Sequence, residues 1–469
     1  MPGASTDSLS ERESGLQRGL GKAQVVMIGL GGAIGTGLFL GSGLAVAYAG
    51  PAVIVSYALA GFVALVMVFS LSEMAVVHPT AGSFGTYAEM YLNPWAGFVV
   101  RYTYWIAQAI AVGGESVAAG LYMQLWFPNV PVWAWALGLC VILLYLNSRA
   151  VANFGTVESW LAVIKVTAII IFIILGIASI VGIGHPAVGL HNLTGLPGGF
   201  LPKGVSGLWM AVTVGIFSFY GIEVIAVTSG ETRNPEVAIP AALRTMLLRL
   251  FLFYVLAVGV MVTIAPWTDT GAKGVAQSPF VTVLQHTGVR DAAGIMNFVV
   301  VSAALSSMNT DVYLCSRMLF SLSRGGYAPR AFGTLSRSGS PVAAILVSGV
   351  CVLLAAGASF FTPHAYADLL GVALFAAIIV WMIVLVTHLS FRRRHAGDRL
   401  PVLMPFFPWM QYAGLAILAA VLVTMGLDSN FDVSWLYGVP WLALISLIYF
   451  VRRGRARTAD LESQTMQKD

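Results

Sequence analysis

The sequence predicts an all-α membrane protein with twelve transmembrane helices. Of its 469 residues, 58% are hydrophobic and only 10% are charged, whereas roughly a quarter of the residues in a soluble domain are charged. The hydrophobic residues also fall in blocks of about 20, long enough to cross a bilayer as helices. The predicted spans are 25–47, 51–76, 97–125, 132–147, 158–183, 205–229, 247–266, 292–321, 341–361, 365–389, 409–427 and 433–451.

The lysines and arginines predict the orientation of these spans. With the N-terminus in the cytoplasm, all but four of the 25 basic residues lie on the cytoplasmic side, as the positive-inside rule requires. The exceptions are Lys203, Lys273 and Arg290, which fall outside, and Lys165, which falls within a span. Because the basic residues form no single face, we expect the lipid bilayer and not nucleic acid as the partner.

The predicted spans and their orientation divide the chain into four parts. They are a cytoplasmic tail at 1–22, a ten-helix core at 23–391, a loop with helices 11 and 12 at 392–451, and a second cytoplasmic tail at 452–469. The first tail is polar and leads into a full-length span, so we expect no cleaved signal peptide.

The first span contains a glycine run, IGLGGAIGTGLFLGSG at 28–43, in which seven of sixteen residues are glycine. Each glycine in a helix interior costs about 1 kcal/mol relative to alanine. One interpretation is close helix packing. The other is a discontinuous helix, unwound at Gly35, Thr36 and Gly37, whose free N–H groups suit a carboxylate.

The sixth span has a second candidate interruption at 217–221, FSFYG, just before Glu223. Spans one and six begin two five-span halves. Paired interruptions at corresponding places indicate an inverted-repeat transporter with a site near the bilayer midplane. We therefore expect a 5+5 inverted repeat with discontinuous helices 1 and 6, plus two extra helices.

Three ionisable residues lie well inside spans, namely Glu115, Lys165 and Glu223. A charge at membrane depth costs about 2.5 kcal/mol or more, so each is a functional candidate. Lys165 either snorkels to the cytoplasmic interface or is buried. Burial disfavours its charged form and allows it to exchange a proton, and its side chain also fills space that a sodium ion would need.

Other polar residues are expected nearer the span ends. Glu73, Glu158 and Asp311 are assigned solvated or structural positions, and all seven histidines, including His388, are assigned to loops or span edges. No histidine proton relay is therefore predicted. No metal-spaced His/Cys cluster, phosphate loop or nucleophile motif is visible, so we expect no enzyme, no cofactor and no metal site.

Four stretches together carry a family resemblance: RGLGKAQVVMIGLGGAIGTGLFLGSG (18–43), YMQLWFPNVPVWAWAL (122–137), FSFYGIEVIAVTSGETRNPE (217–236) and SSMNTDVYLCSRMLFSLSRGGYAP (306–329). They resemble the amino acid permeases of the amino acid–polyamine–organocation superfamily. The resemblance covers nearly the whole chain, and the best overall match is to γ-aminobutyrate permease-like members. It implies two inverted five-helix repeats plus two helices, working by alternating access.

The resemblance also implies roles for individual residues. The substrate carboxylate is placed at the first break, Ile34, Gly35, Thr36 and Gly37, and the amine at the second, Phe217, Ser218, Tyr220 and Gly221, with Phe217 as an aromatic gate. Coupling or gating roles fall to Lys165, Glu115 and Glu223. Tyr220 departs from the small residue of many relatives, which puts large substrates in doubt.

We therefore expect a secondary transporter of the cell membrane that imports an amino acid with protons. A zwitterion, γ-aminobutyrate among the candidates, is favoured because one break suits a carboxylate and the other an amine. Exchange of an amino acid for a related metabolite by the same fold remains open, as does uptake of a cationic amino acid or polyamine, given the acidic Glu115 and Glu223. A substrate sensor would usually carry a sizeable soluble domain, and both predicted tails are short.

Overall fold

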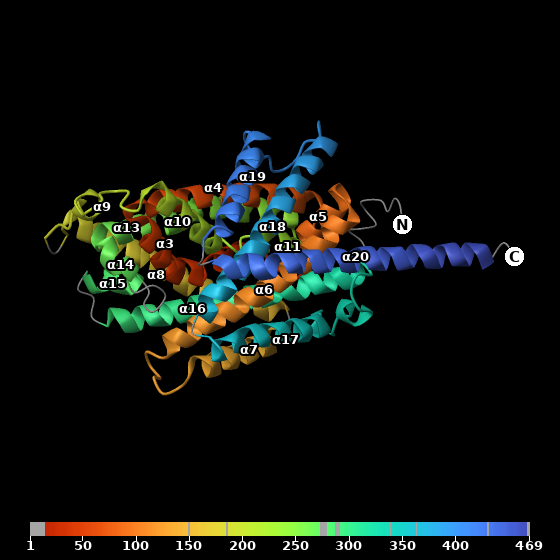
Figure 1. Cartoon of the computed structure of the whole chain (residues 1–469), viewed down its shortest axis with the longest axis horizontal. Coiled ribbons are helices and arrows are strands. Elements are labelled where there is room, and N and C mark those ends of the chain that lie inside the picture. The colour runs from red at the N-terminus through yellow and green to blue at the C-terminus, as the bar shows by residue number, and fades with distance from the viewer. Residues whose placement is uncertain are drawn as a thin grey trace.

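The computed structural model describes residues 15–148, 151–183, 186–272, 279–286, 291–337, 339–362, 364–428 and 431–466. Within these ranges the regular structure is helical, and extended segments pair only in an isolated bridge between Leu20 and Thr232. Most of the helices run along the long axis of an elongated bundle (Figure 1). The predicted all-α class is therefore confirmed.

The first half of the chain contains the segments that surround the glycine run. They are α2 (Lys22–Ala33), the π-helical turn η1 (Gly37–Gly41), α3 (Ser42–Ala49), α4 (Val53–Val77), α5 (Ser83–Tyr91), α6 (Pro94–Met123), α7 (Val132–Asn147) and α8 (Val151–Val181). A 3-10 turn at Gly50–Ala52 separates α3 from α4. Gly50 has a φ of 59° there, a conformation that glycine adopts readily.

The second half contains the second interrupted helix and the long central helix. Its main elements are α10 (Gly204–Ser218), α11 (Val224–Thr228), α12 (Pro235–Arg249), the π-helical turn η4 (Leu250–Leu256), α13 (Ala257–Ile264), α16 (Ala292–Arg324), α17 (Val342–Gly357), α18 (Ala365–Arg394), α19 (Trp409–Met425) and α20 (Asp432–Met466). Three short helices lie in the connections: α9 (His191–Thr194), α14 (Trp267–Ala272) and α15 (Pro279–His286).

Each predicted span lies on helical segments, and many of them have membrane-spanning character. Among the described residues, 7 helical stretches are long and apolar enough to cross a membrane. Four further apolar helices are shorter: Val132–Asn147, Gly204–Ser218, Leu252–Ile264 and Trp409–Met425. The longest stretch, Lys22–Val77, contains two predicted spans because it runs through the turn at Gly50–Ala52. The count of twelve stays a prediction.

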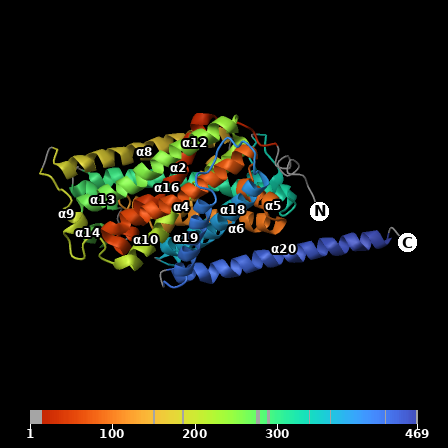
Figure 2. The ribbon, with the colours of Figure 1, turned by 90° about the horizontal axis from the view of Figure 1, so that it is seen from above.

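The fraction of buried residues distinguishes a central pair of helices, α6 and α16, from a peripheral helix, α20. α16 and α6 pack against each other, and α17 and α18 pack on α6. In the most apolar window of α16, 89% of residues are buried, against 22% for α20. Figure 2 shows α20 along one side of the bundle, with its C-terminal part projecting beyond it. The exposed apolar side chains of α20 are suited to lipid contact.

Described residues of both predicted tails take part in regular structure. No helix end lies at the predicted boundary of 451, because α20 continues to Met466 through a segment rich in good helix formers. In the N-terminal tail, Leu20 is buried. Its N–H donates to Glu231 O at 3.0 Å, and its carbonyl accepts from Arg233 N at 3.0 Å. The chain just before α2 is thus fixed to the segment after α11.

Candidate functional site

The first predicted break is present. α2 ends at Ala33, and the helix resumes in η1 at Gly37. Ile34, with φ −105° and ψ 89°, leaves the helical region. Thr36 has helical dihedral angles and Gly37 already belongs to η1. The interruption is thus centred on Ile34 and Gly35, about one residue earlier than the sequence suggested.

The second break lies slightly later than predicted. Phe217 and Ser218 are the last residues of α10, and the non-helical turn runs over 219–223 before α11. Gly221 sits in this turn with a φ of 96°, in the region that favours glycine. The expectation that Phe217 and Ser218 are unwound is therefore wrong. The positive φ at Gly221 is the physical reason that the turn is centred there.

The two interrupted helices touch each other through glycines. A β-carbon at Gly221 would overlap Gly32 O, and one at Gly37 would lie 2.8 Å from Ser218 Cα. Ser218 Oγ donates to Gly37 O at 2.8 Å and lies 2.9 Å from the Tyr57 hydroxyl. The glycine run therefore serves both interpretations, because it interrupts the helix and also permits close backbone packing.

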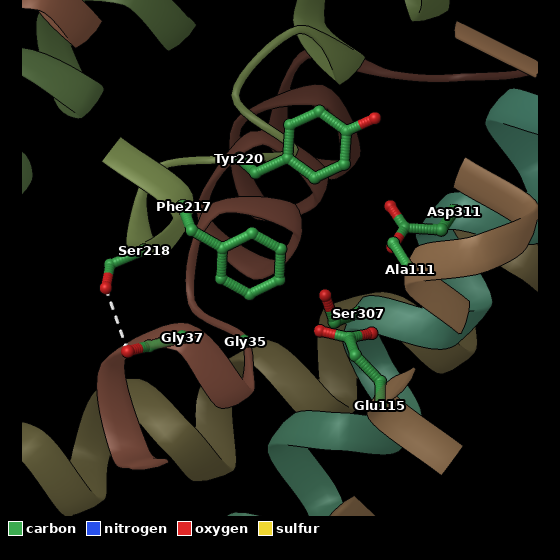
Figure 3. Close-up of a pocket in the computed structure, with 9 residues that line it drawn as sticks. All are labelled: Gly35, Gly37, Ala111, Glu115, Phe217, Ser218, Tyr220, Ser307 and Asp311. Atoms are coloured by element: carbon green, nitrogen blue, oxygen red, sulfur yellow. Dashed lines mark hydrogen bonds between the residues drawn. The ribbon is translucent and has the colours of Figure 1, made fainter. Parts of the chain in front are cut away.

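A buried cavity lies beside this crossing. Its walls are Gly35, Gly37, Ala111, Glu115, Phe217, Ser218, Tyr220, Ser307 and Asp311. Figure 3 shows the Phe217 and Tyr220 rings facing Glu115, Ser307 and Asp311 from the opposite wall. The two rings are stacked with centroids 6.2 Å apart, and the open space is only about that of one water molecule. A larger ligand requires these rings to move.

The structure brings five of the eight predicted binding residues to this cavity. They are Gly35, Gly37, Phe217, Ser218 and Tyr220. Ile34, Thr36 and Gly221 do not line it. The Ile34 carbonyl accepts from Lys165, Thr36 Oγ1 lies 3.5 Å from Glu115 Oε1, and Gly221 packs on Gly32. These three residues therefore contact neighbours of the cavity and not the cavity itself.

Three lining residues were not predicted: Ala111, Ser307 and Asp311. Helical spacing carried a signal for two of them. Ala111 lies four residues before Glu115 and Ser307 lies four before Asp311, so each pair shares a helix face. Of the two positions expected for Asp311, the solvated one is wrong, since Asp311 is only 3% exposed within α16.

Lys165 is buried, which excludes snorkelling to the interface. Its Nζ donates to Gly31 O and, at 2.7 Å, to Ile34 O. Both carbonyls lie at the C-terminal end of α2, where the regular helical hydrogen bonds run out; Gly31 O also accepts from Ile34 N at 3.2 Å. The lysine on α8 thus caps the broken end of α2, behind the cavity wall.

Glu115 and Glu223, the two predicted coupling carboxylates, have different surroundings. Glu115 lines the cavity, and its Oε1 would lie 2.8 Å from a β-carbon placed on Gly35. Glu223 does not line it. Its carboxylate accepts from Gly221 N at 2.9 Å and from the Trp381 indole, so it stabilises the turn of the second break.

Three further residues that were placed in loops or near span ends, His388, Glu73 and Glu158, are buried, which excludes a solvated position for each. His388 is buried in α18 and lies 2.9 Å from Glu73 Oε2 and 2.9 Å from Gln411 Nε2. Glu73 is also buried, and Arg392 lies 3.4 Å from it, so the structural pairing expected for Glu73 is present. Glu158, which was also assigned a solvated or structural position, is fully buried. Ion pairs and hydrogen bonds in the interior offset the free-energy cost of burying these polar side chains.

The fold and the cavity together define a class. This is a multi-pass α-helical membrane protein with an enclosed, partly polar cavity between two interrupted helices, the arrangement of secondary transporters. Comparison with known sequences then gives the family. The amino acid permease profile matches residues 24–462.

Individual relatives agree with that match over almost their whole length. An uncharacterized amino acid permease of Bacillus subtilis, YtnA, is 37% identical over 463 residues, which cover 97% of this chain and 99% of YtnA. The gamma-aminobutyric acid permease of Bacillus subtilis is 37% identical over 468 residues, 98% and 99% of the two chains. The aromatic amino acid transport protein AroP of Salmonella typhimurium is 37% identical over 448 residues, 94% and 97%.

The chain therefore belongs to the amino acid permease family. It is a membrane transport protein and not an enzyme, and the predicted family resemblance is confirmed.

Proposed function

We propose that this permease imports an amino acid together with protons by alternating access. The observation that carries the proposal is the buried lysine at the broken helix. Lys165 Nζ donates to the carbonyls of Gly31 and Ile34 at the end of α2, next to a cavity between the two interrupted helices. A cationic side chain there fills a carbonyl site that a sodium ion would otherwise suit, and a buried ammonium can lose a proton.

The cavity suggests how an amino acid is oriented. Its nine lining residues include the carboxylates of Glu115 and Asp311 and no lysine or arginine. The substrate carboxylate is therefore assigned to the backbone N–H groups of Gly35 and Gly37, which line the cavity at the start of η1. The substrate amine lies toward the carbonyls near Phe217, Ser218 and Tyr220 and toward the acidic wall.

Tyr220 and Phe217 set the size of the substrate. Both rings lie in the cavity wall and are less than 9% exposed. Among the described residues the Tyr220 hydroxyl has no hydrogen-bond partner, so it is available to a bound substrate. A small or flexible zwitterion fits this wall best, while the two carboxylates support a cationic amino acid or polyamine as the second candidate.

The membrane arrangement is part of the proposal. Twelve spans, two inverted five-helix repeats with helices 1 and 6 interrupted, two added helices, and both termini in the cytoplasm follow from the span pattern and the distribution of basic residues. The cell membrane is the expected location. Glu223, which holds the turn at Gly221, is assigned to gating.

Transport by purified protein in liposomes tests the proposal. A thermal-shift screen against the protein amino acids and γ-aminobutyrate first identifies the ligand. Its tritiated form should then accumulate when the outside is acidic, and a sodium gradient should have no effect. Sodium-driven uptake that ignores a proton gradient contradicts the coupling. Uptake that occurs only with amino acid inside the liposome indicates an exchanger.

A variant at the proposed coupling residue separates coupling from binding. Lys165→Met should abolish accumulation driven by a proton gradient but retain counterflow of the same amino acid. Accumulation against the gradient by this variant contradicts the assignment of Lys165.

A further inference from the structure

Lys165 shares its helix with a second buried charge. Glu158 lies seven residues earlier on α8, two turns away and on the same face. Both side chains are 0% exposed. Both also meet the same residue of α2, because Gly31 O accepts from Lys165 Nζ and a β-carbon at Gly31 would overlap the Glu158 carboxylate. Gly31 therefore brings the end of α2 against both groups.

Three carboxylates surround the single ammonium of Lys165. They belong to Glu158, Glu115 and Asp311, and Glu158 is the one that shares both the α8 face and the Gly31 contact with Lys165. Glu115 and Asp311 line the cavity, where they face the substrate, but Glu158 does not. Glu158 is thus the acidic neighbour of Lys165 that stays available when a substrate amine fills the cavity.

Neutral groups hold the Glu158 carboxylate. Ser306 Oγ donates to Oε1, and Asn309 Nδ2 donates to Oε2 at 3.2 Å. Among the described residues no lysine or arginine forms an ion pair with it. A hydroxyl can donate to a carboxylate or accept from a carboxylic acid. The surroundings of Glu158 therefore accommodate both its ionised and its protonated form.

A polar path leads away from Glu158. Asn309 Oδ1 accepts from Asn147 Nδ2 at 2.9 Å. Asn147 is the last residue of α7 and is 8% exposed. In the proposed orientation this end of α7 and the start of α8 face the cytoplasm. Glu158 then lies between Lys165 and the cytoplasmic surface.

We infer that Glu158 is the relay through which the proton of Lys165 leaves toward the cytoplasm. The inference rests on the proposed proton-coupled import. In the first step the Lys165 ammonium loses one proton and the Glu158 carboxylate gains it, which leaves a neutral amine and a neutral carboxylic acid. In the second step Glu158 gives that proton to water near the end of α7. Because the first step leaves the net charge of the buried pair unchanged, it avoids the cost of an unpaired buried charge.

The α-carbons of Lys165 and Glu158 are about 10 Å apart along the helix, and no ion pair joins the two side chains within 4.0 Å. The transfer therefore uses a side-chain rotation or an intervening water. Glu158 acts through Lys165 and does not touch the substrate, so it is a positioning and relay residue.

The test compares two modes of transport in proteoliposomes, with a tritiated mixture of the protein amino acids and γ-aminobutyrate as the probe. Glu158→Gln should reduce proton-driven accumulation by about tenfold or more and leave counterflow within about twofold of the wild type. Glu158→Asp, which keeps the carboxylate, should retain most accumulation. Glu231→Gln is the matched control. This buried carboxylate is paired with Arg317, so its loss should lower both modes together.

Two results overturn the relay. One is undiminished proton-driven accumulation by Glu158→Gln, and the other is a parallel loss of both modes, as in Glu231→Gln. If Glu158→Gln does not fold, Ser306→Ala keeps the carboxylate but removes one donor. This variant should displace the pH of half-maximal accumulation by about half a pH unit, with counterflow unchanged. If the pH of half-maximal accumulation does not move, the relay is overturned. A wild type that ignores proton gradients instead refutes the proposed function itself.

Discussion

Two buried charge clusters lie against α16, and they are built in opposite ways. In the Arg317 cluster (Arg317, Glu231 and Tyr313), the guanidinium binds the Glu231 carboxylate at 2.8 and 3.3 Å. The Tyr313 hydroxyl donates to the same carboxylate at 3.0 Å, and its ring centroid lies 3.9 Å from the guanidinium carbon. One cation and one anion are matched, with both carboxylate oxygens occupied.

The Lys165 cluster (Lys165, Glu158, Glu115 and Asp311) has one cation and three carboxylates. The ammonium binds backbone carbonyls instead of a carboxylate. Several unpaired buried anions would be costly, so the charge balance of this cluster favours binding of protons. Arginine does not lose its proton in proteins, whereas lysine does when it is buried. The comparison teaches that the Arg317 cluster fixes structure, while the Lys165 cluster is suited to changes of protonation.

The largest expected effect comes from breaking the matched pair. Arg317→Met leaves the Glu231 carboxylate buried and uncompensated, which should lower the free energy of unfolding by about 3–5 kcal/mol. Thermal unfolding in detergent measures the change. The double variant Glu231→Gln/Arg317→Met should recover part of the loss. If Arg317→Met unfolds at the wild-type temperature, the structural role of this cluster is wrong.

The next effect concerns the backbone crossing beside the Lys165 cluster. Gly221→Ala introduces a β-carbon against Gly32 O at a φ of 96°, and should cost about 3 kcal/mol. Both uptake and thermal stability should fall. Gly138→Ala is the control, because Gly138 lies in α7 with nothing within 4 Å of its added β-carbon. If the two variants have equal uptake and equal thermal stability, the close backbone contact between Gly221 and Gly32 is unimportant.

The smallest effect is expected at the cavity wall. Tyr220→Phe removes a hydroxyl that lacks a partner among the described residues. If the substrate uses it, the substrate concentration for half-maximal uptake should rise about fivefold, or about 1 kcal/mol, without loss of stability. Tyr437→Phe, on the exposed face of α20, should change nothing. Unchanged uptake by Tyr220→Phe removes the hydroxyl from the substrate site.

Local sequence signals predicted much of this fold. Apolar length predicted the helices, and glycine density predicted the first break to within about one residue. The second break was displaced because its determinant is a single residue, Gly221, whose positive φ depends on contact with Gly32. Burial of Glu158 and His388 was missed because each lies near the end of a predicted span, where sequence position alone cannot distinguish solvent from a packed interior. Asp311 lies further inside its span, and its burial depends on how α16 packs against α6.

The candidate site was predicted only in part, because some of its residues carry a local sequence signal and others do not. Residues of the two breaks were found because breaks are visible in sequence. Ala111 and Ser307 were not, because they become wall residues only when α6 and α16 pack together. The partners of Lys165, which are carbonyls at the end of α2, carry no side-chain signal at all.

Proton movement during transport tests the central claim most directly. The purified protein is placed in liposomes that contain a pH-sensitive dye, and the amino acid selected in the thermal-shift screen is added outside. The account predicts internal acidification that accompanies uptake in the wild type and is absent in Lys165→Met, although this variant still performs counterflow. Uptake without acidification in the wild type, or undiminished acidification in Lys165→Met, would contradict it.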